Sequence, residues 1–356
     1  MPKIFAIALS GGVDSSVTAH LIKKQYNQSI VGVMANVNEF SPSAAVDAKK
    51  IADDLNIPFY FIDLQKEFKD IVIDYFMNEY QNGRTPNPCI ICNPIIKFGL
   101  MYDELKQLLL ANNTMQSSDD LILVTGHYAQ IIFSNNRYNI LKAVDIKKDQ
   151  SYMLYGLSQE QLSRFVTPLG NLSKEQVRTI AKELNLHVAN KPDSQDICFI
   201  QGNYKDYLQK HLSKKINQGK FIDKDGNVLG KHLGIPFYTI GQRKGIGIAA
   251  EKPLYVAKIN SQTNEITLLQ GSELKSKTCI LKHMNWVSIS HPNKSLRANV
   301  RIRYNSKESL ATINILSPDT AEILFDNFQE SITPGQAGVI YDGNILLGGG
   351  IISLTS

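Results

Sequence analysis

Apolar runs alternate with amphipathic segments along the first half of the chain. The apolar runs are typical of strands that are buried on both faces, and they occupy residues 4–9, 30–34, 58–62 and 121–125. Segments with apolar positions at helical spacing lie between them, at residues 44–56, 68–80 and 95–110. This alternation predicts a doubly wound parallel sheet in an α/β domain. A capping box at Ser173-x-x-Gln176 predicts one more helix, which ends near Asn185.

The pattern changes after about Cys198. Residues 223–232 are typical of a β-hairpin, and a glycine-rich loop follows at Gly241–Gly247. From about Thr278, short alternating runs separated by turn residues predominate, at 296–304, 311–316, 321–325 and 337–341. These runs predict a small C-terminal β-barrel. We therefore expect a catalytic domain over residues 1–200, a central domain over 201–272 and the barrel over 273–356.

Composition places the chain among globular proteins. It has 356 residues, of which 43% are hydrophobic and 20% charged, enough for two or three domains. We expect neither a signal peptide nor a membrane span, because the first apolar run is short and no window reaches ~20 apolar residues. The net charge of +5 is uneven, with ten Lys or Arg against four acids between Lys205 and Lys252. Such an excess fits a solvated face or a nucleic-acid surface.

The turn after the first predicted strand reads Ser10-Gly11-Gly12-Val13-Asp14-Ser15-Ser16. Its glycines let the backbone approach an anion, and the helix behind it offers unpaired N–H groups. It is neither a Walker loop nor a Gly-x-Gly-x-x-Gly turn. It resembles the pyrophosphatase loop of enzymes that split ATP into AMP and pyrophosphate, in which Asp14 would hold Mg²⁺. The alternative is a polar turn in which a serine caps the helix.

The four cysteines are Cys89, Cys92, Cys198 and Cys279, and their small number suggests a reducing cytoplasm. Residues 85–94 hold three prolines, which predicts a stiff loop around Cys89-x-x-Cys92. Such a pair is a candidate for redox, metal or nucleophilic chemistry, or is simply two buried thiols. Cys198 lies in a second loop-like stretch, residues 191–200, and alone would be an ordinary buried cysteine.

Several motifs together resemble the tRNA-specific 2-thiouridylases, in the family's order from residue 10 to Gly348-Gly349-Gly350. They are Gly83-Arg84-Thr85-Pro86-Asn87-Pro88, Cys92-Asn93, Ile96-Lys97-Phe98, Thr125-Gly126-His127-Tyr128, Lys148-Asp149-Gln150-Ser151-Tyr152, Asp193-Ser194, Cys198-Phe199-Ile200 and Thr239-Ile240-Gly241-Gln242-Arg243-Lys244-Gly245. The resemblance covers nearly the whole chain and implies an adenine nucleotide α-hydrolase-like first domain.

The resemblance also implies an activity, the ATP-dependent 2-thiolation of the wobble uridine at position 34 of tRNA. The uracil 2-carbonyl would attack the α-phosphate of ATP, so that pyrophosphate leaves and AMP becomes the leaving group. Cys198 would carry a persulfide, and Cys92 would attack it or free hydrosulfide as a Cys92–Cys198 disulfide forms. The implied ATP site comprises Ala8, Leu9, Ser10, Gly11, Gly12, Val13, Asp14, Ser15, Met34 and Gly126.

By the same resemblance, the partners are the anticodon loop of tRNA and a cysteine desulfurase or sulfur-relay protein. The residues implied to contact tRNA are Asn87, Pro88, Cys89, His127, Asp149, Gln150, Ser151, Arg303, Tyr304 and Gln336. The basic span 205–252 would contact phosphates, centred on Gln242-Arg243-Lys244.

The chain departs from the family pattern at three places. Cys89 stands where many members have an aspartate, the connection 35–43 is short, and Pro94 replaces a residue that is often basic. The first departure opens a second route, in which Cys89, Cys92 and Cys198 ligate an iron–sulfur cluster whose remaining iron carries the sulfur. We favour the persulfide route, because it needs only the two cysteines that the whole resemblance shares.

Two other classes of protein compete with this interpretation. An amidotransferase-type ATP pyrophosphatase, such as a GMP or NAD synthetase, would share the loop at residues 10–16 but needs neither Cys92 nor Cys198. A non-enzymatic RNA-binding protein would need neither the loop nor the cysteines.

Overall fold

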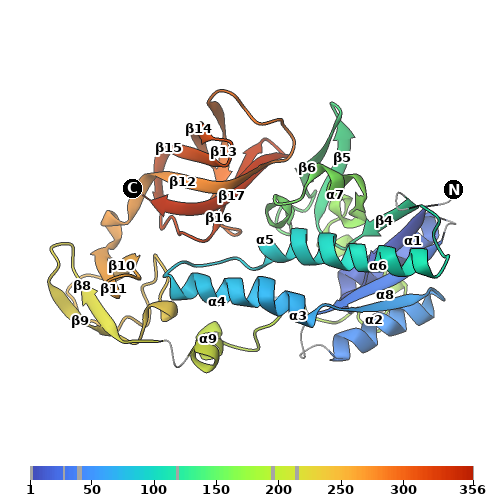
Figure 1. The fold of residues 1–356 in the computed structure, drawn as a ribbon, viewed down its shortest axis with the longest axis horizontal. Coiled ribbons are helices and arrows are strands. Elements are labelled where there is room, and N and C mark those ends of the chain that lie inside the picture. Colours follow the sequence, from blue (N-terminus) through green and yellow to red (C-terminus); the bar gives the residue numbers. More distant parts are fainter. Residues whose placement is uncertain are drawn as a thin grey trace.

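The structure is a computed structural model in which residues 3–26, 29–37, 42–117, 120–193, 197–212 and 216–355 are described. Residues 38–41 of the short connection 35–43 and Ser194 of the Asp193-Ser194 motif lie outside the described residues. Within them, the chain forms an α/β body, a small central sheet and a β-barrel (Figure 1). No helix in these ranges is long and apolar enough to cross a membrane.

The predicted parallel sheet is confirmed. Among the described residues its strands run in the order β3-β2-β1-β4-β7, and every pairing is parallel. The bounds are β1 Ile4–Ala8, β2 Ile30–Asn36, β3 Phe59–Asp63, β4 Leu121–Val124 and β7 Phe165–Val166. The chain builds outward from β1 to β3 and then returns to place β4 on the other side of β1. This reversal is the switch point at which doubly wound sheets bind ligands.

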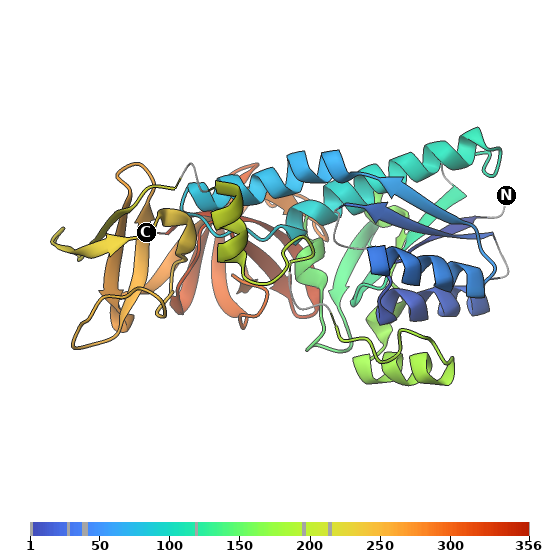
Figure 2. The same cartoon turned by 90° about the horizontal axis from the view of Figure 1, so that it is seen from below.

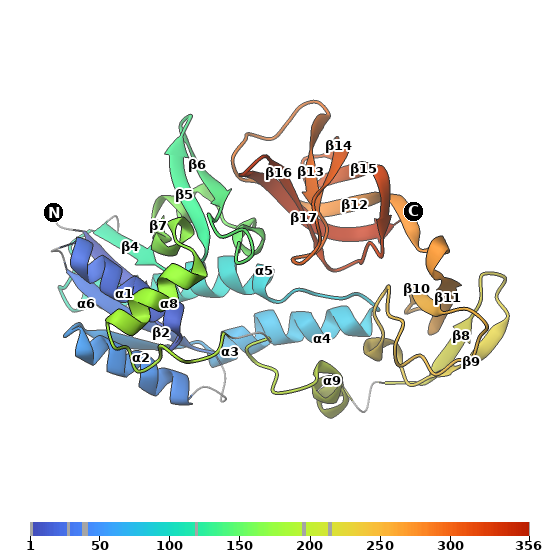
Figure 3. The same cartoon turned by 180° about the vertical axis from the view of Figure 1, so that it is seen from behind.

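Alternating residues of β1 belong to two cores. Ala6 packs in the core that includes Leu105, whereas Ile7 packs in the core that includes Val17 and Val177. The second core is covered by α1 (Val13–Gln25), α2 (Pro42–Asp54) and α8 (Lys174–Glu183), which lie in front of the sheet in Figure 3. The first is covered by the helix that contains Leu105, so the strands lie between two helical layers (Figure 2).

Two long helices, each interrupted by a π-helical segment, extend from the body toward the barrel and the central sheet. The first comprises α3 (Gln65–Phe68), η1 (Lys69–Ile73) and α4 (Asp74–Gln81). The second comprises α5 (Cys89–Cys92), η2 (Asn93–Leu100) and α6 (Met101–Ala111). Both agree with the helical spacing in the sequence.

The prediction of a stiff loop across residues 85–94 is wrong beyond Pro88, because Cys89 already begins α5. A proline inside a helix removes an N–H donor, but the wide π-helical turn of η2 accommodates Pro94. The Pro94 carbonyl accepts a hydrogen bond from Gln161 Nε2 at 2.7 Å. The consequence for the site is that Cys89 and Cys92 stand one turn apart on a helix, on the same side.

The central domain confirms the predicted hairpin, which is formed by β8 (Gly219–Ile222) and β9 (Val228–His232). The sheet order is β10-β11-β8-β9, with β10 (Leu254–Asn260) and β11 (Glu265–Gln270). Helix α9 (Tyr204–Leu212) joins it to the body, where Tyr204 stacks on Tyr80 with ring centroids 5.4 Å apart. The glycine-rich loop has positive φ at Gly241, Gly245 and Gly247.

The C-terminal barrel is also confirmed. Its sheet runs β12-β15-β14-β13-β16-β17 and closes through pairing of β12 with β17. The bounds are β12 Lys275–Trp286, β13 Leu296–Arg301, β14 Ser309–Ser317, β15 Thr320–Glu330, β16 Ala337–Asp342 and β17 Ile345–Thr355. A hairpin absent from the sequence prediction, β5 (Ala129–Ser134) with β6 (Arg137–Lys142), extends this sheet through β17.

Shorter helices complete the described structure. They are η4 Ser151–Leu154, α7 Gln159–Ser163, η5 Pro168–Asn171, η7 Ile235–Phe237 and η8 Gly271–Glu273. The capping box predicted at Ser173 and Gln176 is present at the start of α8, which ends at Glu183.

Thr85, four residues before α5, joins the three parts of the molecule. Its N–H donates to the Pro334 carbonyl of the barrel at 2.9 Å, and its own carbonyl accepts from Gln336 Nε2 at 2.8 Å. Its hydroxyl lies 3.3 Å from that of Thr239 in the central domain. Gly335 has a φ of +92°, and a Cβ there would stand 2.9 Å from the Thr85 nitrogen. A glycine is therefore required for the barrel turn to approach the segment that leads to Cys89.

We predict that Gly335→Ala destabilises this joint more than a comparable glycine change elsewhere. Gly343→Ala is the matched control, since its φ is +55° but a Cβ there would meet nothing within 4 Å. The control should cost about 1–2 kcal/mol for its left-handed backbone alone, and Gly335→Ala roughly 1–3 kcal/mol more because it also displaces Thr85. Urea denaturation of both variants tests this, and equal losses would contradict it.

Candidate active site

The loop between β1 and α1 has the shape of an anion cradle. Gly12 caps α1, and the Ser10 and Ser15 hydroxyl oxygens lie 3.1 Å apart across the turn. Gly11 has a φ of +68°, and a Cβ there would stand 2.4 Å from the Ala44 carbonyl oxygen. On the β4 side, a Cβ at Gly126 would stand 3.0 Å from the Ser15 nitrogen. Both glycines thus let backbone N–H groups gather at the N-terminus of α1.

The other residues predicted to bind ATP lie around this loop. Ala8 ends β1, Leu9 is buried behind the turn, and Met34 lies on β2 beside it, half-buried. The ends of three parallel strands therefore meet where the switch point predicts a ligand. This arrangement fits a nucleotide whose phosphates face the loop.

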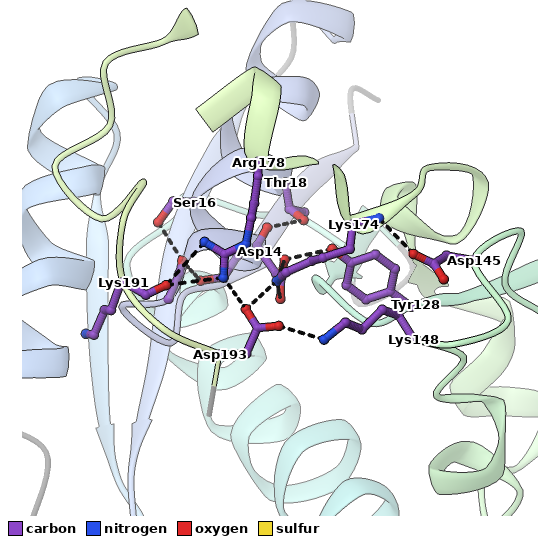
Figure 4. A network of polar contacts seen from close by, with 12 residues as sticks. Asp14, Ser16, Thr18, Tyr128, Asp145, Lys148, Lys174, Arg178, Lys191 and Asp193 are labelled. Carbon is purple, nitrogen blue, oxygen red and sulfur yellow. Dashed lines mark hydrogen bonds and ion pairs between the residues drawn. The ribbon is translucent and has the colours of Figure 1, made fainter. Parts of the chain in front are cut away.

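Asp14, in the first turn of α1, is held by a lysine and a tyrosine. Lys174 Nζ lies 2.7 and 2.9 Å from its two carboxylate oxygens, and the Tyr128 hydroxyl donates to Oδ1 at 2.8 Å (Figure 4). Lys174 comes from the first turn of α8 and is buried. Carboxylate oxygens are ligands that Mg²⁺ prefers, and the metal role of Asp14 stays a prediction.

The Asp193 carboxylate forms ion pairs with three cations. Lys148 Nζ and Arg178 Nη2 each approach it at 2.7 Å, and Lys174 Nζ approaches at 2.9 Å (Figure 4). Burial alone would raise the pKa of Asp193, but hydrogen bonds from Lys148 and Lys174 outweigh it and hold that pKa well below its usual range. The sequence alone does not identify Lys148, Lys174 or Arg178 as residues of the site. The capping box at Ser173 locates the start of α8, but it does not show which loop α8 faces.

The three cysteines of the prediction gather in one region. Asn87 Oδ1 accepts a hydrogen bond from the Cys89 N–H at 3.1 Å at the start of α5, which also carries Cys92. Cys198 lies next to Phe199, whose ring packs edge-on against Phe76 at 5.3 Å. Cys89 and Cys198 both raise the pKa of Cys92, and Cys89 also raises that of Cys198, so the thiols are close neighbours.

The thiols are held in the protonated form. The protein packed around them raises the pKa values of Cys89 and Cys198, although both residues are exposed, and burial raises that of Cys92 to about 12. Lys97, one turn further along the helix, acts in the opposite direction on all three. Basic surroundings favour a thiolate, but here desolvation exceeds the effect of Lys97. No disulfide links the four cysteines, all of which lie in the described part of the chain.

The described residues include no cluster of three or more His, Cys, Asp or Glu side chains arranged to hold a metal ion. An iron–sulfur cluster on Cys89, Cys92 and Cys198 stays a prediction.

His127 connects the end of β4 with the cysteine region. Its Nδ1 lies 2.7 Å from the Thr125 hydroxyl, and its ring centroid is 5.9 Å from that of Phe98, the neighbour of Lys97. Burial first, and then the charge of Lys97, lower the pKa of His127 to about 3. His127 is therefore a neutral imidazole at physiological pH.

The residues predicted to contact the anticodon loop take part in contacts within the protein. Asp149 and Ser151 are buried, and Ser151 Oγ donates to Asp149 Oδ2 at 2.9 Å. Arg301 of the barrel reaches the same oxygen at 3.3 Å. Gln150 Oε1 accepts from the Tyr128 N–H at 3.0 Å. These side chains fasten the body to the barrel, and their contacts with RNA remain a prediction.

The predicted barrel residues lie nearer the surface. Tyr304 is half-buried and close enough to Cys89 for a charge on that thiol to raise the Tyr304 pKa. Arg303 donates to the Glu330 carbonyl at 3.3 Å, while its buried Nε has no hydrogen-bond partner among the described atoms. Arg243 and Lys244 are exposed at the tip of the glycine-rich loop. Pro88, in contrast, is buried.

The parallel sheet and the anion cradle at its switch point define an α/β nucleotide-binding domain. Domain models agree, matching a tRNA methyl transferase HUP domain at residues 3–202, a tRNA methyl transferase PRC-barrel domain at 205–270 and an aminomethyltransferase beta-barrel domain at 276–352. The tRNA-specific 2-thiouridylase MnmA of Clostridioides difficile (strain 630) is 45% identical over 366 residues, covering 99% of this chain and 98% of its own.

Further relatives carry the same name. MnmA 2 of Clostridium botulinum (strain Langeland) is 43% identical over 98% of this chain and 97% of its own, and MnmA of Acetivibrio thermocellus is 43% identical over 97% and 98%. The chain belongs to the tRNA-specific 2-thiouridylase family, and the predicted resemblance is confirmed.

We predict that His127 stays neutral between pH 8 and pH 5. Its lowered pKa means that it stabilises the folded protein fully above about pH 6.5, and that this contribution is lost as the pH falls toward the folded value of about 3. NMR of the imidazole Hε1 signal, assigned with His127→Asn, should show no shift in that range. In urea-unfolded protein the same signal should titrate near about 6.5, and a folded midpoint there would contradict the prediction.

Proposed function

We propose that this protein 2-thiolates the wobble uridine of tRNA by adenylating the uracil 2-carbonyl and transferring sulfur from a cysteine persulfide. The observation that carries the proposal is that one site contains both a cradle for the phosphates of ATP and thiols that can carry sulfur. An anion cradle suited to ATP lies at the end of β4, and His127 and Lys97 connect that strand end with three thiols. Methyl transfer, named in two of the domain models, would need neither the cradle nor the thiols.

ATP makes the 2-carbonyl reactive. The carbonyl oxygen attacks the α-phosphorus, the bond to the β-phosphate oxygen breaks, and pyrophosphate leaves. Ser10, Ser15 and the N–H groups of α1 would hold the phosphates, and Asp14 would hold Mg²⁺, which neutralises the pyrophosphate. Ala8, Leu9, Met34 and Gly126 would line the rest of the nucleotide site.

Sulfur transfer needs two cysteines. The terminal sulfur of a Cys198 persulfide bonds to C2 of the base, AMP leaves with the former carbonyl oxygen, and Cys92 then displaces the thiolated base as a Cys92–Cys198 disulfide forms. Alternatively, Cys92 first displaces hydrosulfide, which attacks C2. Either route needs an external dithiol to reduce the disulfide. Because burial keeps Cys92 protonated, its ionisation depends on Lys97 and on the arrival of substrate.

The substrate and partners follow from the same chemistry. Asn87, Pro88, Cys89, His127 and Tyr304 surround the thiols, where a base leaving its stack would enter. Arg303, Arg243 and Lys244 would contact phosphates. A cysteine desulfurase or a sulfur relay would load Cys198, which is exposed, in a reducing cytoplasm.

The proposal predicts that thiolation and adenylation separate by mutation. Cys92→Ser and Cys198→Ser should each reduce 2-thiouridine to background while AMP and pyrophosphate still form, since adenylation uses no thiol. Cys89→Ser should keep partial activity without added metal. Cys279→Ala, buried in the barrel, is the control and should be active. Mass spectrometry of the tRNA and labelled ATP measure both steps, and release of ADP instead of AMP would refute the proposal.

Binding of tRNA should depend on Arg243, Lys244 and Arg303. Replacing each by alanine should weaken affinity and flatten the plot of log affinity against log salt by about one unit per lost phosphate contact. Lys66→Ala, an exposed lysine on α3 paired with Asp70, is the control and should leave the slope unchanged. An unchanged slope in all three variants would move the RNA site elsewhere.

A further inference from the structure

One side of the anion cradle is formed by cations of α8 and of the loop before η4. We call Lys148, Lys174 and Arg178 the α8 cation cluster. These three cations pair with two carboxylates, Asp14 and Asp193, and a third carboxylate, Asp145, accepts a hydrogen bond from the Lys174 N–H (Figure 4). Cations beside a helix N-terminus attract an anion that can replace one of these carboxylates.

The local structure of α8 fixes this arrangement. The capping box at Ser173 sets the first helical residue, so Lys174 and Arg178 lie one turn apart on the same face. Asp145 Oδ2 accepts a hydrogen bond from the Lys174 N–H at 3.0 Å and anchors the helix start. Lys174 is only 8% exposed, so its ammonium must have an anionic partner in every state of the site.

Lys174 occupies both carboxylate oxygens of Asp14. Of these two oxygens, Oδ1 also accepts from Tyr128. Mg²⁺ bound with a nucleotide would need the oxygens that Lys174 occupies here. Lys174 has a second partner in Asp193 at 2.9 Å, and Lys148 and Arg178 hold Asp193 in place. The ammonium can therefore leave Asp14 while it stays on Asp193.

We propose that Lys174 is an exchangeable partner of the pyrophosphate loop. In the nucleotide-free protein it neutralises Asp14. When ATP binds, its ammonium moves from Asp14 to a β- or γ-phosphate oxygen, which leaves Asp14 for Mg²⁺, and Asp193 is the fixed point of this movement. The inference rests on the proposed function and adds to it a residue that contacts the leaving pyrophosphate.

Calorimetric titration with inorganic pyrophosphate, in EDTA and in Mg²⁺, tests the exchange. Lys174→Gln should weaken pyrophosphate binding about tenfold or more in both, because a charge-assisted contact is lost. Asp14→Asn should act in the opposite direction in EDTA and tighten binding severalfold, because Lys174 no longer has Asp14 as partner. It should also abolish the gain from Mg²⁺. In EDTA the double variant should behave like Lys174→Gln.

Lys182→Gln is the matched control, because it removes the same charge from the exposed last turn of α8. It should leave pyrophosphate affinity within about twofold of wild type. Lys174→Arg keeps the ion pairs and should retain most of the binding, which separates loss of contact from loss of folding. Circular dichroism and melting curves of every variant complete that check.

The outcomes distinguish this inference from the proposed function. If wild-type protein forms AMP but Asp14→Asn fails to tighten magnesium-free binding, or Lys174→Gln binds as wild type does, the exchange is wrong and the function stands. If the wild type forms neither AMP nor 2-thiouridine, the proposed function itself fails.

Discussion

The parallel pairing of β1 with β4 is the constraint on which the site depends. It sets Ile7 beside Val124, so the loop after β1 and the residues after β4 leave the sheet together. Gly126 can then lie against the Ser15 nitrogen, and Tyr128 can reach Asp14. A side chain at Gly126 would separate the two. The same strand end supplies His127, which leads to the cysteine region, so one strand pairing organises both the phosphate cradle and the approach to the thiols.

The barrel is fastened to the cysteine helix by polar contacts. Gln336 and Pro334 hold Thr85 ahead of α5, and buried Asp149 receives Arg301 from the barrel. Each of these contacts has one partner in the body and one in the barrel. Removing either partner would leave a buried charge or a peptide group without a hydrogen bond. A barrel that binds RNA would thus act directly on the segment that positions Cys89 and Cys92.

Much of the fold follows from local patterns in the sequence, and the failures have physical causes. The strands, the α8 capping box and the barrel were predictable because periodicity and turn residues are local signals. The prediction of a loop over residues 85–94 was wrong beyond Pro88. It counted prolines as helix breakers, whereas the wide π-helical turn accommodates Pro94. The pairing of β6 with β17 joins residues that are about two hundred positions apart in the sequence. No local pattern predicts such a pairing. The contact of Lys174 with Asp14 depends on the packing of α8 beside α1, so only the structure reveals it.

Both halves of the site are electrically neutralised before substrate arrives. Asp14 is paired with Lys174, and the thiols are protonated because their surroundings desolvate a thiolate. On the proposed function, ATP breaks the first pairing, and tRNA brings the electrophile that makes a thiolate useful. Lys97 acts on the ionisation of all three thiols and of His127, so one cation influences both the cysteine region and the histidine at the end of β4. Because the thiolate is the nucleophile, thiols held in the protonated form react slowly until a change in their surroundings lowers their pKa values.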